Sequence, residues 1–376
     1  MKVLIDFSQI PCQKVGVGVY ACETFKRILT VNSKDDFYIL LQDDDEEILK
    51  TFPKAHKILV PSNFFRIFIF RFLLEQIYIP YLCLKYKVKI IHSLHYSFPL
   101  LCFWVKRVVT IHDLTFFIYP EMHTFIKRYF FRVFIILACR VTDAIICVSN
   151  STKKDLFKYV SVVKAKVYVV PLAASILKVN NLDISFVKEK FSIRKDYILF
   201  IGTLEPRKNV CNLLKSFGTT NHLLQNYQLV LVGKKGWYYQ SIFDIIHQLG
   251  LDKSVIITGF VTEKEKYCLL SAASVFVYPS IYEGFGLPVL EAMSYGIPTV
   301  TSNVSSLPEV AGDAALLVNP NEIEELSHAI DHILTNSSLQ TEMRLRSIKQ
   351  ANKYSWEKTA KLTMEVYSFC NYNEFA

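Results

Sequence analysis

Short apolar runs rich in valine and isoleucine recur along the whole chain, and stretches of helix length separate them. The runs are continuous and do not alternate with polar residues, which is typical of parallel strands buried on both faces. The predicted strands of the first half are residues 3–7, 37–41, 57–60, 88–93, 108–112, 144–148 and 167–170. Those of the second half are residues 197–202, 229–233, 255–259, 275–278, 299–302 and 315–318. The pattern predicts an α/β protein with two doubly wound, Rossmann-like domains.

The break between the two domains is expected after the seventh predicted strand. Pro171 interrupts the pattern there, and no strong strand follows before Tyr197. We predict an N-terminal domain at residues 1–172, a linker at 173–195 and a C-terminal domain that begins at residue 196 and ends at 354. Ligands of open α/β sheets bind outside the carboxyl ends of the strands, so a cleft between the domains is the expected ligand site.

Composition and charge narrow the class of protein. The chain has 376 residues, of which 51% are hydrophobic, and this excludes a disordered chain. The net charge is +9, but residues 1–180 hold 25 basic and 14 acidic residues and therefore carry all of the excess. Nine cysteines without a C-x-x-C pair favour neither a zinc ribbon nor a disulfide framework. The first predicted strand follows Met1 and Lys2 directly, so we expect a cytoplasmic protein without a signal peptide.

Two segments of the first half combine aromatic and basic residues. Residues 63–84 are rich in phenylalanine, but Arg66, Arg71 and Glu75 interrupt them, and a charge near the centre of a spanning helix costs about 2.5–3.5 kcal/mol. Residues 125–139 are too short to span a bilayer. Both segments predict helices that pack on a sheet and have a basic, aromatic outer face. That face is either a solvated surface or a peripheral contact with the cytoplasmic face of the inner membrane.

Two turns that follow predicted strands contain residues of the kinds that bind phosphate. Gly16-Val17-Gly18 leads into a helix, and glycines at such a turn let backbone N–H groups approach a phosphate. The alternative is a plain tight turn. Residues 202–209 (GTLEPRKN) place Arg207 beside Lys208, which can offer a fork and a point charge to adjacent phosphates. Two adjacent buried cations repel each other unless an anion is present, and the alternative is a solvated pair in a loop.

The richest motif follows the predicted strand 275–278. Residues 279–293 contain several glycines ahead of a helix, with Pro288 suited to the first turn. Glu283 lies in the loop, and Glu291 falls about one turn into the helix on the side of the same crevice. Carboxylates accept hydrogen bonds from sugar or ribose hydroxyls. The alternative for such a glutamate is a structural interaction with the helix dipole.

Two further stretches follow strands. Residues 302–310 place small hydroxylated residues, among them Ser305 and Ser306, ahead of another helix. Residues 110–115 place His112 at the end of a strand, where a catalytic role competes with a structural one.

No metal site is predicted. The acidic run at residues 43–47 contains D-x-D, which is a metal-binding signature in some enzymes, but it is interpreted as a solvated helix start. His92 and His95 are three positions apart and lack evident carboxylate or cysteine ligands nearby.

Together these stretches closely resemble the retaining glycosyltransferases of family 4, which have the GT-B fold of two Rossmann-like domains facing a central cleft. The resemblance extends from Gly16 to residues 354–360, and its most specific parts are residues 202–209 and 282–291. The second of these contains the family's two glutamates, here Glu283 and Glu291. The resemblance also implies that residues 355–376 form a helix that crosses back towards the N-terminal domain.

The resemblance implies roles for individual residues. Arg207 and Lys208 would bind and stabilise the departing diphosphate of a sugar nucleotide, Glu291 would hold the ribose, and Glu283 and His112 would lie at the donor sugar. The catalytic residues are then His112, Arg207, Lys208 and Glu283. The residues that bind the donor nucleotide are Gly16, Val17, Gly202, Arg207, Lys208, Phe285, Gly286, Leu287, Glu291, Ser305 and Ser306.

The resemblance implies a hexosyltransferase that needs neither a metal nor another cofactor. GDP-mannose is the favoured donor, with UDP-sugars as alternatives, because residues 205–209 (EPRKN) are similar to those of bacterial mannosyltransferases. The expected acceptor is a glycan, lipid-linked in O-antigen or capsule synthesis, and no nucleic-acid partner is expected. The alternatives are a sugar-nucleotide epimerase of the same fold and a catalytically silent scaffold at the membrane surface.

Overall fold

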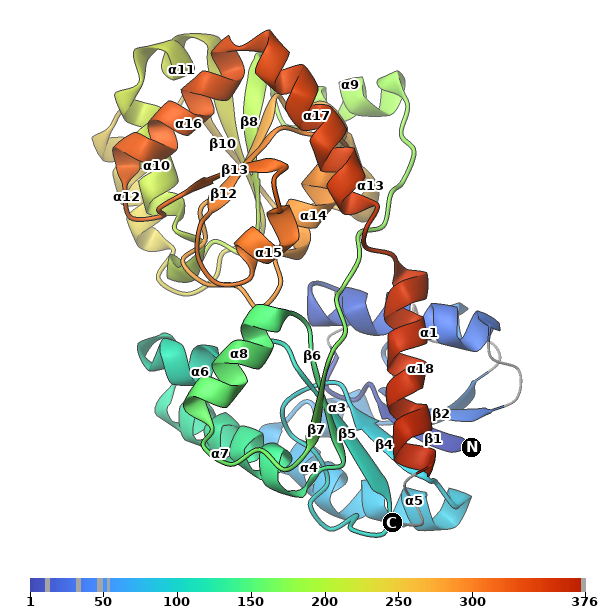
Figure 1. Cartoon of the computed structure of the whole chain (residues 1–376). Helices are drawn as coiled ribbons and strands as arrows, with labels where there is room; N and C mark the ends of the chain where they lie inside the picture. The colour runs from blue at the N-terminus through green and yellow to red at the C-terminus, as the bar shows by residue number, and fades with distance from the viewer. Residues whose placement is uncertain (11–13, 32–34, 46–49, 53–54, 373–376) are drawn as a thin grey trace. The chain divides into compact units, whose positions relative to one another are not determined.

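The computed structural model describes residues 1–10, 14–31, 35–45, 50–52 and 55–372 (Figure 1). The described chain forms two compact units. Unit 1 consists of Met1–Leu172 and Ser355–Ala376, and unit 2 consists of Ala173–Tyr354.

Unit 1 contains a parallel sheet of seven strands among its described residues, in the order β3-β2-β1-β4-β5-β6-β7. The order changes direction between β1 and β4, which is the topological switch point of a doubly wound fold. The strands are β1 (Lys2–Asp6), β2 (Asp36–Gln42), β3 (His56–Val60), β4 (Ile90–Ser93), β5 (Lys106–Ile111), β6 (Ala144–Cys147) and β7 (Lys166–Val169).

Helices cover both faces of this sheet. On one face, Leu82 of the helix α5 packs with Leu4 and Leu40, and Ile135 of α7 packs with Val109. These two apolar clusters share that face, because Leu4 is paired with Ile91, and Ile91 is paired with the residue two positions before Val109. The helical segments are α1 (Val17–Val31), α3 (Ser62–Phe65), α4 (Phe68–Leu73), η1 (Leu74–Tyr78), α5 (Ile79–Tyr86), α6 (Thr115–Ile118), η2 (Pro120–Met122), α7 (Phe125–Val141), α8 (Asn150–Tyr159) and α18 (Trp356–Tyr372).

The helix α18 belongs to unit 1 although it comes last in the sequence. It lies beside α1 (Figure 1), where Arg27 Nε is 3.5 Å from Glu357. The Thr359 hydroxyl donates to the carbonyl of Pro171 at 2.7 Å. The buried Tyr367 hydroxyl lies 2.6 Å from Nδ1 of His92 on β4. These contacts make α18 part of the first unit's core.

Unit 2 contains a second parallel sheet, with six strands in the order β10-β9-β8-β11-β12-β13. The strands are β8 (Asp196–Ile201), β9 (Tyr227–Val232), β10 (Val255–Gly259), β11 (Val275–Tyr278), β12 (Thr299–Ser302) and β13 (Ala315–Val318). The helical segments are α9 (Asn181–Lys190), η3 (Pro206–Lys208), α10 (Val210–Thr219), α11 (Asn221–Asn226), α12 (Gln240–Gln248), α13 (Glu263–Ser271), α14 (Leu287–Ser294), α15 (Leu307–Ala311), α16 (Ile323–Thr335) and α17 (Ser337–Ala351). The order changes direction between β8 and β11, so the motifs that follow these strands meet at one edge.

Each strand predicted from the sequence is present, and the two doubly wound sheets confirm the predicted fold class. Residues 173–195, expected to be a linker, instead belong to unit 2 and contain α9. This helix is tied to α13 by an ion pair of 2.7 Å between Asp183 and Lys264 and by a second pair between Lys190 and Glu265. In the described part of the chain, each helix is too short or too polar to cross a bilayer.

Candidate functional site

The carboxyl group of Glu283 is the centre of a buried polar network at the carboxyl edge of the unit 2 sheet. Its Oε1 atom lies 2.5 Å from Lys208 Nζ and accepts hydrogen bonds from Tyr278 (3.0 Å) and Ser280 (2.7 Å). Its Oε2 atom lies 2.9 Å from Arg207 Nη1. The loops after β8 and β11 therefore meet at one carboxylate.

Arg207 is held from several sides. Its guanidinium contacts Glu205 at 2.9 Å as well as Glu283, and it donates to the carbonyl of Tyr282 at 2.8 Å. The carbonyl of Arg207 accepts from the amide of Ile281 at 2.9 Å. The sequence prediction missed Glu205, although its place two residues before Arg207 was a usable signal.

Two glutamates therefore compensate the two cations. Burial would raise the pKa of Glu283, but the charges of Arg207 and Lys208 outweigh burial and lower that pKa to about 2. Burial, and then the charge of Arg207, lower the pKa of Lys208, and Glu283 opposes this change. Adjacent buried cations repel each other unless an anion lies beside them. In this structure the carboxylates of Glu205 and Glu283 are those anions.

Ser305 and Ser306 hold the loop that carries Glu283. The Ser305 hydroxyl accepts from the amide of Glu283 at 3.0 Å, and the Ser306 hydroxyl contacts the carbonyls of Glu283 and Phe285 at 2.9 and 2.7 Å. Gly286 closes the loop with φ of +104°, and a Cβ there would lie 2.7 Å from the side chain of Leu307. The structure thus shows a positioning role for both serines and a steric reason for the glycine.

The helix α14 begins at Leu287, directly after this loop. The N–H groups of a first helical turn lack partners within the helix, and the helix dipole adds positive character. Phe285, Gly286 and Leu287 were expected to bind the sugar nucleotide. Their backbone N–H groups lie at the start of this helix, a few residues after Glu283.

Glu291 lies one turn into α14 and is buried. Its Oε1 atom lies 2.8 Å from Nζ of Lys266 on α13, a partner that the sequence prediction missed. Burial raises the pKa of Glu291, and Lys266 partly offsets this effect. A carboxylate offers about four acceptor positions, so Glu291 retains capacity for ribose hydroxyls.

Gly202 lies where β8 approaches β9 closely. Its amide donates to the carbonyl of Val232 at 2.8 Å, and a Cβ on the neighbouring Gly233 would lie 2.0 Å from the Gly202 oxygen. The two chain segments can approach in this way only if residue 233 has no side chain. Gly202 thereby directs the chain into the loop that carries Glu205, Arg207 and Lys208.

In unit 1, Gly16 and Val17 form the start of α1 at the carboxyl edge of the sheet. Gly16 has φ of +47°, and its carbonyl accepts from the amide of Tyr20 at 3.0 Å. Val17 is the first residue of α1. The expected glycine turn ahead of a helix is therefore present.

His112 follows β5 at the same edge of unit 1. Its Nε2 atom lies 2.8 Å from the carbonyl of Leu94, which can only accept, so Nε2 carries the proton. Burial lowers the pKa of His112, although the Leu94 carbonyl and Asp113 oppose this effect, and the ring is therefore neutral at pH 7. Nδ1 is then an acceptor that suits a sugar hydroxyl.

His92 and the acidic run at residues 43–47, which were not predicted to bind a metal, contact other side chains. The two nitrogens of His92 contact Tyr367 and Thr110 at 2.6 and 2.8 Å. In the acidic run, Asp44 pairs with Arg66 at 2.5 Å and Asp45 pairs with Lys14, whereas residues 46 and 47 lie outside the described residues. Within the described ranges, no group of three histidine, cysteine, aspartate or glutamate side chains is arranged to hold a metal ion.

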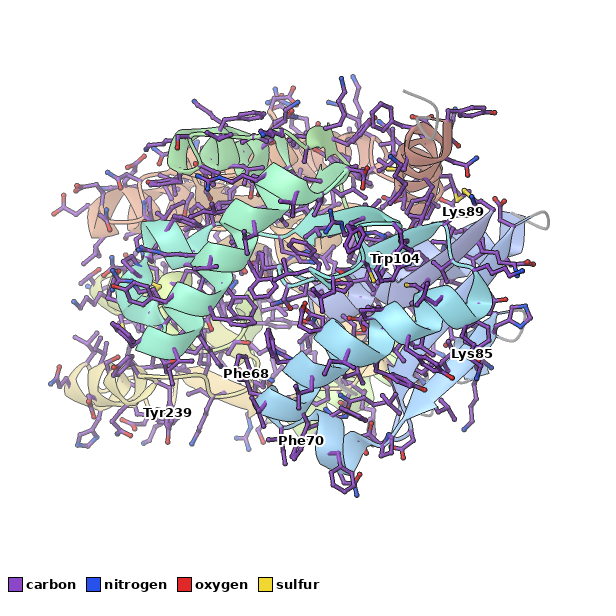
Figure 2. All side chains as sticks on the ribbon, turned by 90° about the horizontal axis from the view of Figure 1, so that it is seen from below. Phe68, Phe70, Lys85, Lys89, Trp104 and Tyr239 are labelled. Carbon is purple, nitrogen blue, oxygen red and sulfur yellow. The ribbon has the colours of Figure 1, made fainter. Side chains whose placement is uncertain are left out.

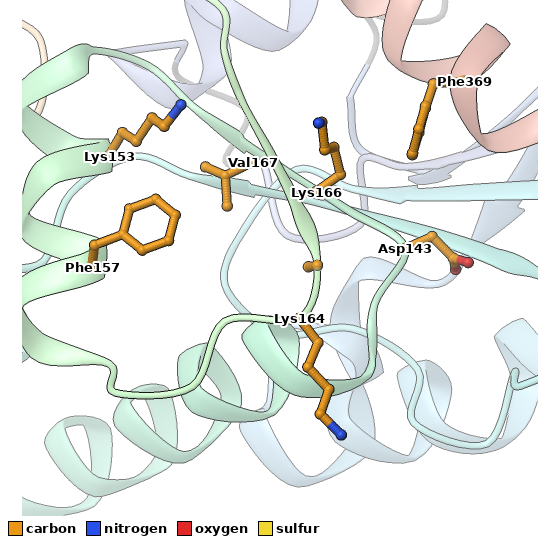
Figure 3. A pocket seen from close by; sticks show the side chains of 8 residues that line it. Asp143, Lys153, Phe157, Lys164, Lys166, Val167 and Phe369 are labelled. Atoms are coloured by element: carbon orange, nitrogen blue, oxygen red, sulfur yellow. The ribbon is translucent and has the colours of Figure 1, made fainter.

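A hollow beside β7 in unit 1 is separate from these residues. Figure 3 shows Lys153 and Phe157 of α8, Lys166 of β7 and Phe369 of α18 around it. Lys166 begins β7 and Asp143 directly precedes β6, so the hollow extends to the amino ends of the strands. Ligands of this architecture bind at the carboxyl ends, so the hollow is not the candidate site.

Comparisons with known proteins agree with this arrangement. The family profile "Glycosyltransferase Family 4" matches residues 16–174, and the profile "Glycosyl transferases group 1" matches residues 183–354. The O-antigen chain mannosyltransferase B of Escherichia coli is 32% identical over 266 residues, which is 70% of each chain. The serotype-specific mannosyltransferase WbdA of Escherichia coli is 31% identical over 233 residues, which is 60% of this chain but 29% of that relative.

Solved structures share the fold at lower identity. Sucrose-phosphate synthase from Thermosynechococcus elongatus is 18% identical with a TM-score of 0.78, and the match covers 98% of each chain. Anabaena HepE in complex with UDP and glucose is 17% identical with a TM-score of 0.78, and the match covers 98% of this chain and 99% of that chain. The fold and the two profiles define the protein as a glycosyltransferase of the GT-B class. Within that class, the chain belongs to glycosyltransferase family 4.

Proposed function

We propose that this glycosyltransferase transfers mannose from GDP-mannose, with retention, to a glycan acceptor in O-antigen or related surface polysaccharide synthesis. Relatives named as O-antigen chain mannosyltransferases support the sugar and the pathway class, since they are 30–32% identical over 65–70% of this chain. The donor base and the retained stereochemistry follow from the resemblance to the family.

The main support for the proposed donor site is that Arg207 and Lys208 both contact one buried carboxylate, that of Glu283. This contact keeps two adjacent cations in place before a donor binds. Within the described residues, Tyr278 and Glu283 use two of the three N–H donors of Lys208, which leaves one for a phosphate oxygen.

The proposed chemistry follows from the leaving group. The bond from C1 of the sugar to the diphosphate breaks, and negative charge grows on the diphosphate as C1 gains oxocarbenium character. Arg207, Lys208 and the start of α14 supply fixed positive charge to stabilise the departing group, in the role that a metal has in other transferases. The acceptor hydroxyl then bonds to C1 from the same face, and its proton passes to the departing phosphate.

We propose in addition that unit 1 contacts an anionic membrane surface through residues 62–86. The helices α3 and α4 have no buried residue, and Phe64, Phe68 and Phe70 are exposed on them. Figure 2 shows Phe68 and Phe70 at one end of this segment and Lys85 towards the other. Exposed aromatic and basic side chains on short helices suit the boundary between headgroups and acyl chains.

The experiment that tests the donor site is release of nucleotide from a panel of sugar nucleotides. GDP-mannose should give the fastest release, and GDP should raise the melting temperature. An excess of ten times Kd corresponds to about 1.4 kcal/mol of added stability. A protein that neither binds nor cleaves any sugar nucleotide would instead be a scaffold, and one that converts the sugar without releasing nucleotide would be an epimerase.

A further inference from the structure

The hollow beside β7 lies at the open edge of the unit 1 sheet. In the described sheet β7 is the last strand, and its residues are exposed or half-buried, whereas those of its neighbour β6 are buried. The hollow has a volume of about 460 Å³, and its lining comes from β7 and the residues just before it, from α8, from α18 and from Asp143. None of the lining residues is among those expected to bind the donor.

The hollow extends around the edge of β7, because it is lined from both faces of the sheet. Val167 packs in the apolar cluster that contains Leu156 of α8. The next residue, Tyr168, faces the opposite side, where its ring contacts Phe369 of α18 with centroids 5.7 Å apart. Figure 3 shows Phe157 of α8 on one side of β7 and Phe369 on the other. A ligand in the hollow therefore meets the edge of the strand itself.

This edge offers backbone hydrogen-bonding groups. The amide of Lys166 donates to the carbonyl of Asp143 at 3.1 Å, on the β6 side. Successive residues of a strand direct their N–H and C=O groups to opposite edges, so those of Val167 and Val169 are directed away from β6. Among the described residues, no hydrogen bond joins these groups to a segment other than β6. A row of donors and acceptors of this kind can pair with one more strand.

Positive charge surrounds the same edge. Lys153, Lys164 and Lys166 line the hollow, and within the described ranges none of the three forms an ion pair. The acidic residue of the lining, Asp143, is already paired, because its carboxylate lies 3.1 Å from Nζ of Lys106. The hollow therefore holds positive charge that no carboxylate of the described residues neutralises.

The charge and the strand edge together limit the possible occupants. A second copy of this chain would bring the same lysines to the edge, and like charges on neighbouring strands oppose pairing. Free phosphate or the phosphate of a lipid headgroup matches the lysines, but it offers no N–H donor to the carbonyls of Val167 and Val169. An acidic peptide in an extended conformation matches both the charge and the backbone groups.

We propose that β7 binds an extended acidic segment of a partner protein, which adds to the unit 1 sheet as a further parallel or antiparallel strand. Its backbone pairs with Val167 and Val169. Its acidic side chains contact Lys153 on the α8 side and Lys166 on the α18 side. In this mode of binding, main-chain hydrogen bonds supply affinity and the side chains on alternate positions supply specificity.

The test measures binding of a short fluorescent peptide in which glutamate and valine alternate. Combined Lys153→Gln and Lys166→Gln should weaken binding by about tenfold or more, and added salt should weaken binding to wild type. Combined Lys154→Gln and Lys158→Gln is the matched control. It removes the same charge from exposed positions of α8 that do not line the hollow, and it should bind the peptide nearly as wild type does.

A proline distinguishes strand addition from simple charge attraction. Val167→Pro removes the N–H directed to the open edge and keeps the bond of Lys166 on the β6 side, and proline is tolerated on edge strands. This variant should fold, retain nucleotide release and lose the peptide. If it does not fold, a peptide N-methylated at alternate residues tests the same pairing and should not bind to wild type. Hydrogen exchange should slow at the amides of Val167 and Val169 when the unmodified peptide is bound.

Several results would overturn the proposal. They are the absence of peptide binding to wild type, equal binding by Val167→Pro, and equal binding of the N-methylated peptide. Free phosphate and phosphatidylglycerol vesicles are the remaining probes. If either bound through Lys153 and Lys166 while the peptide did not, the hollow would be a plain anion site.

Discussion

Lys208 Nζ lies 2.5 Å from Oε1 of Glu283, and both residues are buried in unit 2. Arg207 contacts the other oxygen of the same carboxyl group at 2.9 Å. The site therefore holds its two cations close to each other at the cost of burying two anions, Glu283 and Glu205, with them.

Replacement of Lys208 should lower the rate of sugar transfer. Lys208→Ala removes one fixed positive charge from the departing diphosphate, and turnover of GDP-mannose should fall by about 100-fold or more. Lys215→Ala, an exposed lysine on α10 of the same unit, is the matched control and should retain wild-type turnover. Wild-type turnover in Lys208→Ala, measured as released nucleotide, would contradict the role assigned to this residue.

Replacement of Glu283 should destabilise the protein and increase its response to nucleotide. Glu283→Gln leaves Arg207 and Lys208 without their shared anion, and removal of one partner of a buried ion pair costs about 3–5 kcal/mol. GDP supplies new negative charge, so it should raise the melting temperature of the variant by more than that of wild type. Calorimetry with and without GDP measures both effects, and an equal response in the two proteins would refute the argument.

Gly286 allows a sharp comparison between two glycines with positive φ. Gly286→Ala introduces strain and also places a Cβ 2.7 Å from Leu307, so it should cost more than about 1 kcal/mol and slow transfer. Gly259 has φ of +71° and open space around its Cβ position, so Gly259→Ala carries the strain alone. Urea unfolding and nucleotide release should show the larger loss for Gly286→Ala. Equal losses would show that the contact with Leu307 is unimportant.

The buried Glu75 should make stability depend on pH. Its pKa is about 8 in the folded protein, mainly because of burial, against an ordinary value of 4.5. The folded state therefore holds a proton that the unfolded state has released, and the contribution to stability is present below pH 4.5 and declines as the pH rises to 8. The melting temperature of Glu75→Gln, relative to wild type, should rise between these pH values. A constant difference would mean that Glu75 is ionised in the folded state.

Membrane contact is tested with vesicles. Replacement of Phe64, Phe68 and Phe70 by serine should reduce flotation with anionic vesicles several-fold and leave hydrolysis of the donor unchanged, because these side chains are exposed. Replacement of the exposed Phe260 in unit 2 by serine is the control. Equal flotation of all three proteins would assign residues 62–86 to an ordinary solvated surface.

The strands were predictable because burial on both faces leaves an uninterrupted apolar run, as in β8 and β11. The helix α9 was missed inside the expected linker, although Asn180 caps it by accepting from the amide of Asp183 at 2.9 Å. An asparagine followed three positions later by an acidic residue is a usable helix-start signal. Only the tertiary contacts of this helix with α13 assign it to unit 2.

The candidate site was predictable where chemistry lies within one short motif, as in Arg207 and Lys208. Glu291 and Lys266 are 25 positions apart on two different helices, and no local sequence pattern predicts their pairing. Likewise, the serines at 305 and 306 were expected at the donor, and their contacts with the Glu283 loop depend on β12 lying beside β11. Long-range contacts of this kind follow from topology, which the sequence specifies only through the complete fold.

The position of α18 has a consequence for the order of folding during synthesis. The ribosome releases unit 2 as one uninterrupted stretch, whereas the contact of His92 with Tyr367 in unit 1 forms only after residue 367 has been made. Unit 2 can therefore mature first on the ribosome, and unit 1 lacks the packing of α18 against α1 until α18 has been made.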